Sequence, residues 1–308
     1  MVRKGDPSPA AQDDSATTLP AGKAMLVSAI RQETGDLKTL LNQVFEERQM
    51  DFSEYREKFI QRRIAVRLRA TGSDNYEEYL RHLKGNHEEM DALLDALTIH
   101  TTQFFRDPKV FEAIRTKILP QILTDEVIEG RKIVRIWSAG CSGGEEAMSI
   151  LILIMEYLTE YLRHQLQMPR IHIVGTDIDR WSIEKANEGV YDETEFQSTP
   201  RVFRDKYFVD MGNRRFWRSK KWNSYFSFRR HDIVKDAPLR HVDLVLCRNT
   251  FIYFKRELQA LCVEKFFNSL KREGFLVLGL TEWSAGETAT GFLSFDRENR
   301  MYQKKGEE

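Results

Sequence analysis

The sequence predicts an α/β fold with a mainly parallel sheet, preceded by a small all-helical region. From about residue 131 onward, short apolar stretches typical of buried strands alternate with helical stretches, which is the pattern of a parallel sheet. From about residue 24 to residue 97, apolar residues recur at helical spacing, and glycine-containing breaks at 71–74 and 85–86 separate short helices.

The strands of this sheet are predicted from the apolar stretches themselves. We expect them at 133–137, 171–176, 226–230, 242–247 and 275–279, with 292–295 and 300–304 adding an antiparallel pair. Between about residues 201 and 230 a mixture of aromatic and basic residues interrupts the alternation, which predicts a small antiparallel β insert. A further helix is expected to begin at Pro108, with Asp107 as its N-cap, and to stop before Pro120.

The composition limits the classes of protein that fit. We divide the 308 residues into a disordered tail (1–22), a helical N-terminal domain (23–97), a linker (98–124) and the α/β domain (125–308). The 47 basic and 47 acidic residues cancel, so any charged surface must be local. The three cysteines have no metal-ligand or disulfide spacing, and no apolar run is long enough to span a membrane. We therefore expect a cytoplasmic protein without a metal or a membrane-inserted segment.

The most informative stretch is the loop from Ser138 to Glu146. It follows a predicted strand, contains Gly140, and opens a helix with Glu145 and Glu146. The next strand ends on Asp177, whose carboxylate suits ribose hydroxyls. The loop lacks the G-x-G-x-x-G spacing of a pyrophosphate cradle, and two glutamates at the helix start would repel phosphates. A nucleoside with a cationic tail fits better, and S-adenosylmethionine is such a ligand. The alternative is an ordinary strand-to-helix turn.

Two other strand ends carry polar residues that would face the same crevice. Arg248, Asn249 and Tyr253 follow the strand at 242–247, although Asn249 also suits a simple helix cap. Asp232 and Ile233 follow the strand at 226–230, where a side chain or backbone group would hold an adenine amino group. An ordinary strand-end turn is an equally simple reading of this second segment.

A basic helical stripe indicates a partner. Few acidic residues stand near it in the sequence, so an acidic partner helix or nucleic acid would suit it, while a solvated charged face is the plainer interpretation. The balanced overall charge and the lack of a glycine–aromatic RNA-binding motif argue against nucleic acid. The stripe consists of Lys58, Arg62, Arg63, Arg67 and Arg69.

With these pieces in place, the chain resembles the CheR family, the S-adenosylmethionine-dependent methyltransferases of bacterial chemoreceptors. The resemblance covers about residues 45–305. Its motifs are the basic helix at 57–70, Thr-Gln-Phe-Phe-Arg at 102–106, Trp-Ser-Ala-Gly-Cys-Ser-Gly-Gly-Glu-Glu at 137–146, Thr-Asp-Ile-Asp at 176–179, and Cys-Arg-Asn-Thr-Phe-Ile-Tyr-Phe at 247–254.

The resemblance implies a methyltransferase sheet with a β-subdomain inserted at 205–228, and methylation of glutamate side chains on the cytoplasmic coiled coil of a chemoreceptor. The protein would act as a monomer and release S-adenosylhomocysteine. The expected cofactor contacts are His100, Thr102, Arg106, Gly140, Glu145, Asp177, Asp232, Ile233, Arg248 and Asn249. From the chemistry of methyl transfer to a carboxylate, which needs no general base, we expect Arg106 and Tyr253 to be the catalytic residues.

Some positions depart from the family pattern. His100 stands where the family has Asn, and Ala147-Met148 stands where it usually has Pro-Tyr. The late G-x-S-E segment reads Gly279-Leu-Thr-Glu282. The departures at 100, 147 and 148 motivate a second hypothesis, a cofactor-binding scaffold that has lost turnover. A methyltransferase for another substrate, such as RNA, is a third.

Overall fold

The structure is a computed structural model that describes residues 36–98, 102–124, 132–161, 170–282 and 291–306. The expected tail at 1–22 lies outside the described residues. The described residues form two compact units, one of residues 36–53 and 67–90 and the other of residues 54–66 and 91–306. None of the described helices is both long and apolar enough to cross a membrane.

The first unit is helical, as predicted for this part of the chain. It contains a helix over residues 36–48, the last turn of α2 (Glu57–Thr71), α3 (Tyr76–Leu83) and the start of α4 (His87–Leu97). Asn75 caps α3 by accepting a hydrogen bond from the Glu78 N–H. Leu40, Val44, Tyr79 and Leu83 are fully buried and form its core.

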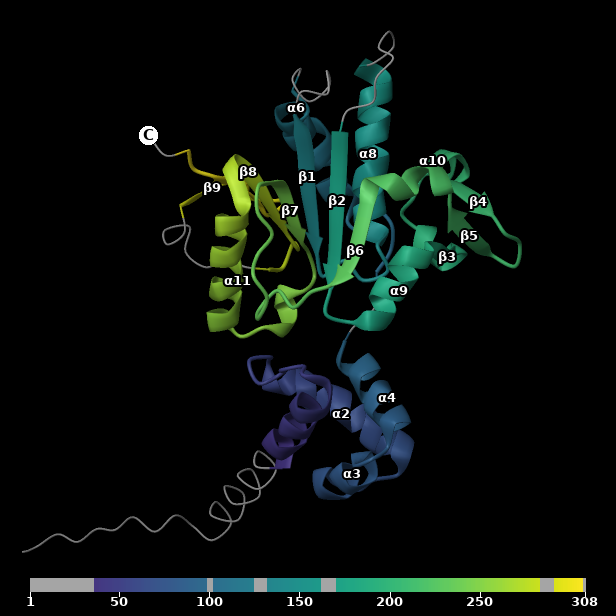
Figure 1. Cartoon of the computed structure of the whole chain (residues 1–308), viewed down its shortest axis with the longest axis vertical. Coiled ribbons are helices and arrows are strands. Elements are labelled where there is room, and N and C mark those ends of the chain that lie inside the picture. Colours follow the sequence, from purple (N-terminus) through teal and green to yellow (C-terminus); the bar gives the residue numbers. More distant parts are fainter. Residues whose placement is uncertain (1–35, 99–101, 125–131, 162–169, 283–290, 307–308) are drawn as a thin grey trace, which may run out of the picture. The chain divides into compact units, whose positions relative to one another are not determined.

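The second unit is built on a seven-stranded sheet, and the predicted parallel strands are confirmed (Figure 1). The strands are β1 (Ile133–Ala139), β2 (Arg170–Asp177), β6 (Phe226–Arg230), β7 (Val242–Cys247), β8 (Leu270–Leu278), β9 (Phe292–Asp296) and β10 (Met301–Lys304). Their order is β6-β2-β1-β7-β8-β10-β9, with β1, β2, β6, β7 and β8 mutually parallel and β10 antiparallel to both of its neighbours. Successive strands are added in one direction from β1 to β6 and in the other from β7 onward. This reversal creates a crevice at the carboxyl ends of β1 and β7.

Helices cover the two faces of this sheet. On one face α8 (Glu145–Tyr161) packs its apolar residues against β1 and β2. On the other face α11 (Arg256–Ser269) packs against β7, β8 and Trp137 of β1. A third helix, α9 (Arg180–Glu188), follows β2 and is capped by the Asp179 carboxylate.

The small antiparallel insert is present, but it begins before the expected residue 205. Its three-stranded sheet has the order β3 (Val190–Asp192), β5 (Arg215–Arg218), β4 (Phe208–Asp210), and α10 (Arg201–Tyr207) leads into β4. A three-residue strand such as β3 is too short to show an alternating pattern, so the sequence did not reveal it.

The helix at Pro108 differs from the prediction in two ways. It continues through Pro120 as α5 (Pro108–Ala113), a π-helical turn (Ile114–Ile118) and α6 (Leu119–Ile122). Proline lacks an N–H group and crowds the carbonyl four residues earlier, so a wider turn directly before Pro120 lets the helix go on. The Asp107 side chain makes no cap hydrogen bond in this structure; its carboxylate accepts a bond from Arg248 instead.

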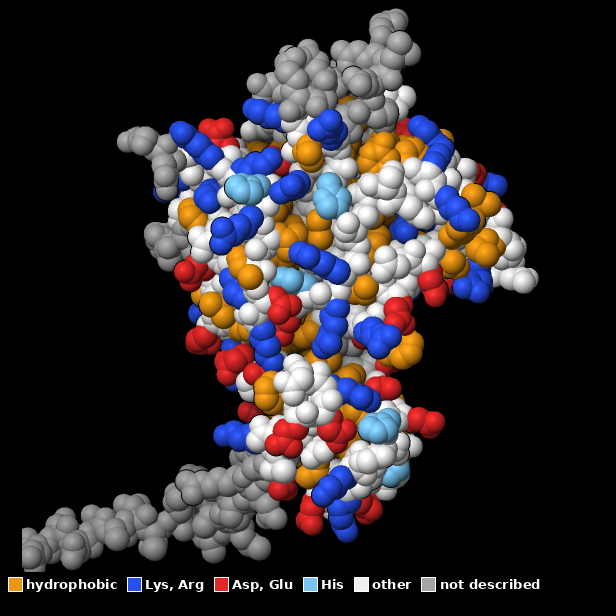
Figure 2. Space-filling view, viewed as in Figure 1, with side chains coloured by type: hydrophobic (Ala, Val, Ile, Leu, Met, Phe, Trp, Pro, Cys, Tyr) orange, Lys and Arg blue, Asp and Glu red, His pale blue; other side chains and the backbone are white. Residues whose placement is uncertain are grey.

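Charge is mixed over the surface. Figure 2 shows Lys and Arg side chains interspersed with Asp and Glu over the viewed face of the described residues. This agrees with the zero formal charge of the chain.

Candidate active site

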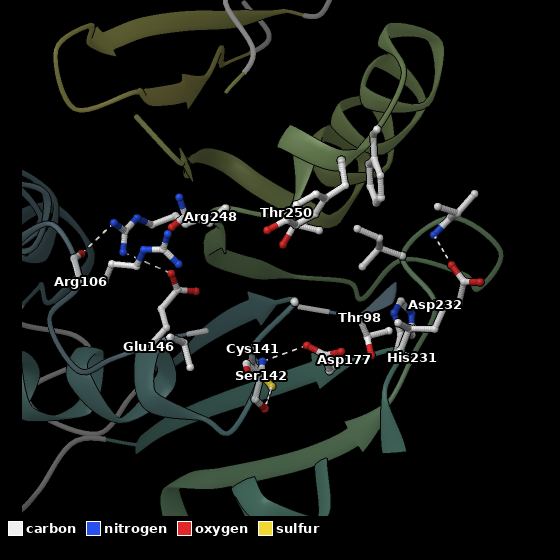
Figure 3. A pocket seen from close by; sticks show the side chains of 18 of the residues that line it. Thr98, Arg106, Cys141, Ser142, Glu146, Asp177, His231, Asp232, Arg248 and Thr250 are labelled. Carbon is white, nitrogen blue, oxygen red and sulfur yellow. Dashed lines mark hydrogen bonds and ion pairs between the residues drawn. The ribbon is translucent and has the colours of Figure 1, made fainter. Parts of the chain in front are cut away.

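A cavity opens where β1, β2, β6 and β7 end (Figure 3). The space between its walls, including open solvent at the mouth, measures about 1080 Å³. Its walls come from the loops after the four strands, from the segments at 97–98 and 102–111, and from Tyr55. The predicted site residues on these walls are Thr102, Arg106, Gly140, Asp177, Asp232, Ile233, Arg248, Asn249 and Tyr253.

The loop after β1 lies close to the loop after β7. The N–H groups of Gly140 and Cys141 both donate to the Thr176 carbonyl, at 2.8 and 2.9 Å. Gly140 has a φ of 75°, and a Cβ added to it would lie 2.5 Å from Thr250 Oγ1. Glycine is therefore required at this position, both for its backbone conformation and for the approach of Thr250.

The carboxylate at the end of β2 is held rigidly. Asp177 Oδ2 accepts the Ser142 N–H at 2.9 Å, and its Oδ1 accepts the Asp179 N–H at 3.0 Å. Asp177 also lines the cavity, so its carboxylate lies where ligand hydroxyls would bind. The arrangement suits a ribose.

The loop after β6 forms the next wall. Asp232 Oδ1 accepts the N–H groups of Val234 and Lys235 at 2.8 and 3.2 Å, which fixes a tight turn. From α11, Lys265 Nζ donates to the carbonyls of Val234 and Asp236. The turn presents the apolar side chain of Ile233 next to the Asp232 carboxylate, a pairing that suits an adenine ring and its amino group.

Arg248 joins three parts of the site. Its side chain is only 2% exposed, and Nη2 donates to Asp107 Oδ2 at 2.6 Å and to the Arg106 carbonyl at 2.8 Å. Nη1 lies 3.5 Å from Glu146 Oε2. Burial raises the pKa of Glu146, and Arg248 opposes that shift. Arg248 thereby ties the segment carrying Arg106 to the start of α8, and Figure 3 shows this link.

Tyr253 and Arg106 lie on the same cavity. Burial raises the pKa of the Tyr253 hydroxyl, and the positive charges of Arg106 and Arg63 oppose the shift without cancelling it. The Tyr253 ring packs on Phe59, with ring centroids 4.6 Å apart. The hydroxyl therefore stays protonated at neutral pH and is available as a hydrogen-bond donor on a cavity that Arg106 also lines.

One predicted cofactor contact is not on these walls, and another cannot be placed on or off them. His100 lies outside the described residues. Glu145 is absent from the cavity lining; it is fully buried and pairs with Lys185 at 2.9 Å. Burial raises the pKa of Glu145 to about 7, and the charge of Lys185 opposes that shift. The glutamate on the cavity wall is Glu146, because successive residues of a helix point about 100° apart.

The basic stripe also needs a correction. Lys58, Arg62 and Arg69 are exposed, and Arg63 lies over the Phe59 ring at 5.7 Å. Arg67, by contrast, makes a two-pronged ion pair with the buried Glu89, at 2.7 and 3.0 Å. The expectation that this stripe lacks a neutralising acid is wrong at Arg67. The two paired residues are 22 positions apart in the sequence, so the charges next to Arg67 in the sequence do not reveal the pair.

The structure also reveals site residues that the sequence reasoning missed. Tyr55, Thr98 and Glu146 line the cavity. Glu282 holds the turn that carries Asn249, since its Oε2 accepts the Asn249 N–H at 3.0 Å. A signal for Glu282 was present in the Gly279-Leu-Thr-Glu282 segment, although nothing in the sequence linked it to Asn249.

The donor set fits one cofactor class. A fixed carboxylate for the ribose, an apolar and acidic wall for the adenine, and carboxylates in place of a phosphate cradle agree with a cationic nucleoside. Together with the strand order, they define an S-adenosylmethionine-dependent methyltransferase.

Comparison with known proteins identifies the family. Residues 100–293 match the family described as CheR methyltransferase, SAM binding domain, and residues 35–98 match the CheR methyltransferase all-alpha domain. The chain belongs to the CheR methyltransferase family.

Several relatives are named as chemotaxis protein methyltransferases. A chemotaxis protein methyltransferase of Borreliella burgdorferi is 30% identical, over 82% of this chain and 89% of the relative. One from Listeria monocytogenes is 29% identical, over 76% and 84%. Chemotaxis protein methyltransferase 2 of Vibrio cholerae is 27% identical, over 75% and 79%.

Proposed function

We propose that the protein transfers the methyl group of S-adenosylmethionine to glutamate side chains on the cytoplasmic helical domain of a chemoreceptor. The names of the relatives support a role in chemotaxis. The observation that carries the choice of a carboxylate is the protonated Tyr253 hydroxyl on a cavity that also carries the positive charge of Arg106. A hydrogen-bond donor suits an anionic acceptor group, and a positive charge on the same cavity favours that anion without a direct contact.

The proposed reaction needs no general base. A glutamate side chain is already ionised at neutral pH, so no proton has to leave the nucleophile. The bound cofactor supplies the electrophilic methyl group. The protein's task is to align the carboxylate, remove its water and keep the reacting atoms in line. Because opposite charges meet in this reaction, a cavity that excludes water favours it.

Arg106 and Tyr253 have different roles in this proposal. The Tyr253 hydroxyl donates a hydrogen bond to one oxygen of the acceptor carboxylate and leaves the other oxygen to attack. A direct contact from Arg106 would hold the carboxylate more firmly but would weaken it as a nucleophile. The bond from Arg248 to the Arg106 carbonyl holds the backbone of Arg106, and we assign its side chain mainly to orienting the cofactor.

The partner surface follows from the corrected stripe. Lys58, Arg62, Arg63 and Arg69 would bind the acidic surface of a receptor coiled coil. Arg67 is excluded, because its guanidinium is committed to Glu89. Lys58, Arg62 and Arg63 belong to the same compact unit as the cavity, which makes them the stronger candidates for guiding a substrate helix.

A labelling experiment tests the proposal. The protein is incubated with methyl-labelled cofactor and a receptor cytoplasmic domain, and the modified residues are identified by mass spectrometry. We expect the label on glutamates, as methyl esters from which alkali releases labelled methanol. A receptor whose modified glutamates are replaced by alanine should take up no label. Label on another residue type or on RNA would overturn the proposal. Cofactor binding without transfer to any receptor tested would favour the scaffold instead.

A further inference from the structure

Glu282 is a buried carboxylate between the ends of two strands. It is 2% exposed and follows β8 by four residues. Its Oε2 accepts the N–H groups of Gly279 and Asn249 at 2.7 and 3.0 Å, and its Oε1 accepts the Ile252 N–H at 3.2 Å. Backbone donors from both strand ends thus surround one side-chain anion, as they surround anions in backbone nests.

The end of β8 is shaped around this carboxylate. A Cβ added to Gly279 would lie 2.6 Å from Glu282 Oε2 and 2.9 Å from the Asn249 nitrogen. Such distances do not occur for real Cβ atoms, so any larger residue would push the carboxylate away from the turn. Gly279 and Glu282 therefore work as a pair.

The turn held by Glu282 is part of the cavity wall. Asn249 has a φ of 60°, a left-handed conformation that asparagine tolerates better than most non-glycine residues, and the Glu282 bond to its N–H holds it there. The Thr250 side chain occupies the space that a Cβ at Gly140 would need, and Tyr253 lies at the end of the same turn. Asn249, Thr250 and Tyr253 all line the cavity, so a shift of this turn moves three groups of the site together.

We propose that Glu282 is a positioning residue for methyl transfer, which acts by holding the turn from Asn249 to Tyr253 in its reactive geometry. It touches neither substrate nor cofactor in this account. The inference depends on the proposed function at one point only: the rate measured in its second test is the rate of methyl transfer to a receptor.

The first test is independent of activity. Glu282→Gln keeps the shape of the side chain but turns one acceptor oxygen into an amide that also faces backbone donors. Hydrogen–deuterium exchange of the free protein should then show faster exchange of the Asn249 and Ile252 amides. Glu298→Gln, at an exposed position, is the matched control and should leave this exchange unchanged.

The second test separates positioning from general stability. In single-turnover measurements at saturating cofactor, Glu282→Gln should lower the transfer rate on the order of 10²-fold, as expected when a reacting group is misplaced by about 1 Å. In a Tyr253→Phe background the same substitution should cost far less, because the two residues act through one turn. Glu282→Asp, which keeps the charge but shortens the reach, should give an intermediate rate and replaces Gln if that variant does not fold.

The outcomes are distinct. Unchanged amide exchange, or rate losses that simply multiply in the double variant, would overturn the positioning role. If the parent protein methylates no receptor carboxylate, the proposed function fails, while amide exchange in the free protein still decides the role of Glu282.

Discussion

Replacing Asp177 with asparagine tests the cofactor site through one charge. Both carboxylate oxygens already accept backbone N–H groups, from Ser142 at 2.9 Å and Asp179 at 3.0 Å. Asparagine has the same shape but no negative charge, and its amide group must face one of those two donors. The variant therefore loses the charged acceptor for ribose and disturbs the loop that presents it.

The magnitude follows from the kind of bond that is lost. A hydrogen bond to a charged group is worth about 1.5–3 kcal/mol, which corresponds to a rise in Kd of roughly 10- to 150-fold. Isothermal titration calorimetry with S-adenosylmethionine or S-adenosylhomocysteine measures this change directly.

A matched control comes from another strand. Asp243 also accepts a backbone N–H, from Arg135 at 2.8 Å, but it stands near the amino end of β7 and is not among the cavity residues. Asp243→Asn should leave the cofactor Kd nearly unchanged. An unaltered Kd in a folded Asp177→Asn protein would remove Asp177 from the site, and equal losses in both variants would point to general destabilisation.

Three further predictions concern the chemistry, the partner and the helical unit. Tyr253→Phe should lower kcat by more than it raises the cofactor or receptor Kd; a rate equal to the parent's would exclude its hydroxyl from catalysis. The double variant Arg62→Glu, Arg63→Glu should raise the receptor KM but leave the cofactor affinity unchanged. Binding of the parent protein to the receptor should also weaken with salt, since exposed charges are screened within about 8 Å. If the variant methylates subsaturating receptor as fast as the parent does, the stripe is only a solvated charged face. Glu89→Gln should destabilise the helical unit by about 3 kcal/mol in denaturant unfolding, because it leaves the Arg67 charge without its partner. Burial opposes ionisation of Glu89, but hydrogen bonds from Arg67 and Tyr79 outweigh the effect of burial and lower the pKa of Glu89. The stability that the ion pair contributes is therefore present near neutral pH and lost on acidification. A difference in unfolding free energy between parent and variant that persisted in acid would contradict this explanation.

The sheet was predictable because its signals are local. Apolar stretches separated by helical stretches showed the strands, and polar residues at the strand ends pointed to one crevice. Asp177, Asp232 and Arg248 all meet on the cavity, as the shared direction of parallel strands requires.

The features that the sequence did not show depend on distant contacts or on helical phase. The Arg67–Glu89 pair and the Glu282–Asn249 bond join positions 22 and 33 residues apart. Which of two adjacent glutamates faces the cavity depends on where α8 begins, and a shift of one residue exchanges their roles. The continuation of the helix through Pro120 depends on a π turn, which no local sequence pattern predicts.

In the proposed mechanism, geometry, and not proton removal, drives methyl transfer to a carboxylate. The most direct measurement is the single-turnover rate with prebound cofactor and saturating receptor, followed from neutral to mildly alkaline pH. Since the acceptor is already ionised and the pKa of Tyr253 is raised by burial, the rate should stay flat across this range. A clear rise with pH near neutrality would reveal a base that must lose a proton, and it would contradict the account.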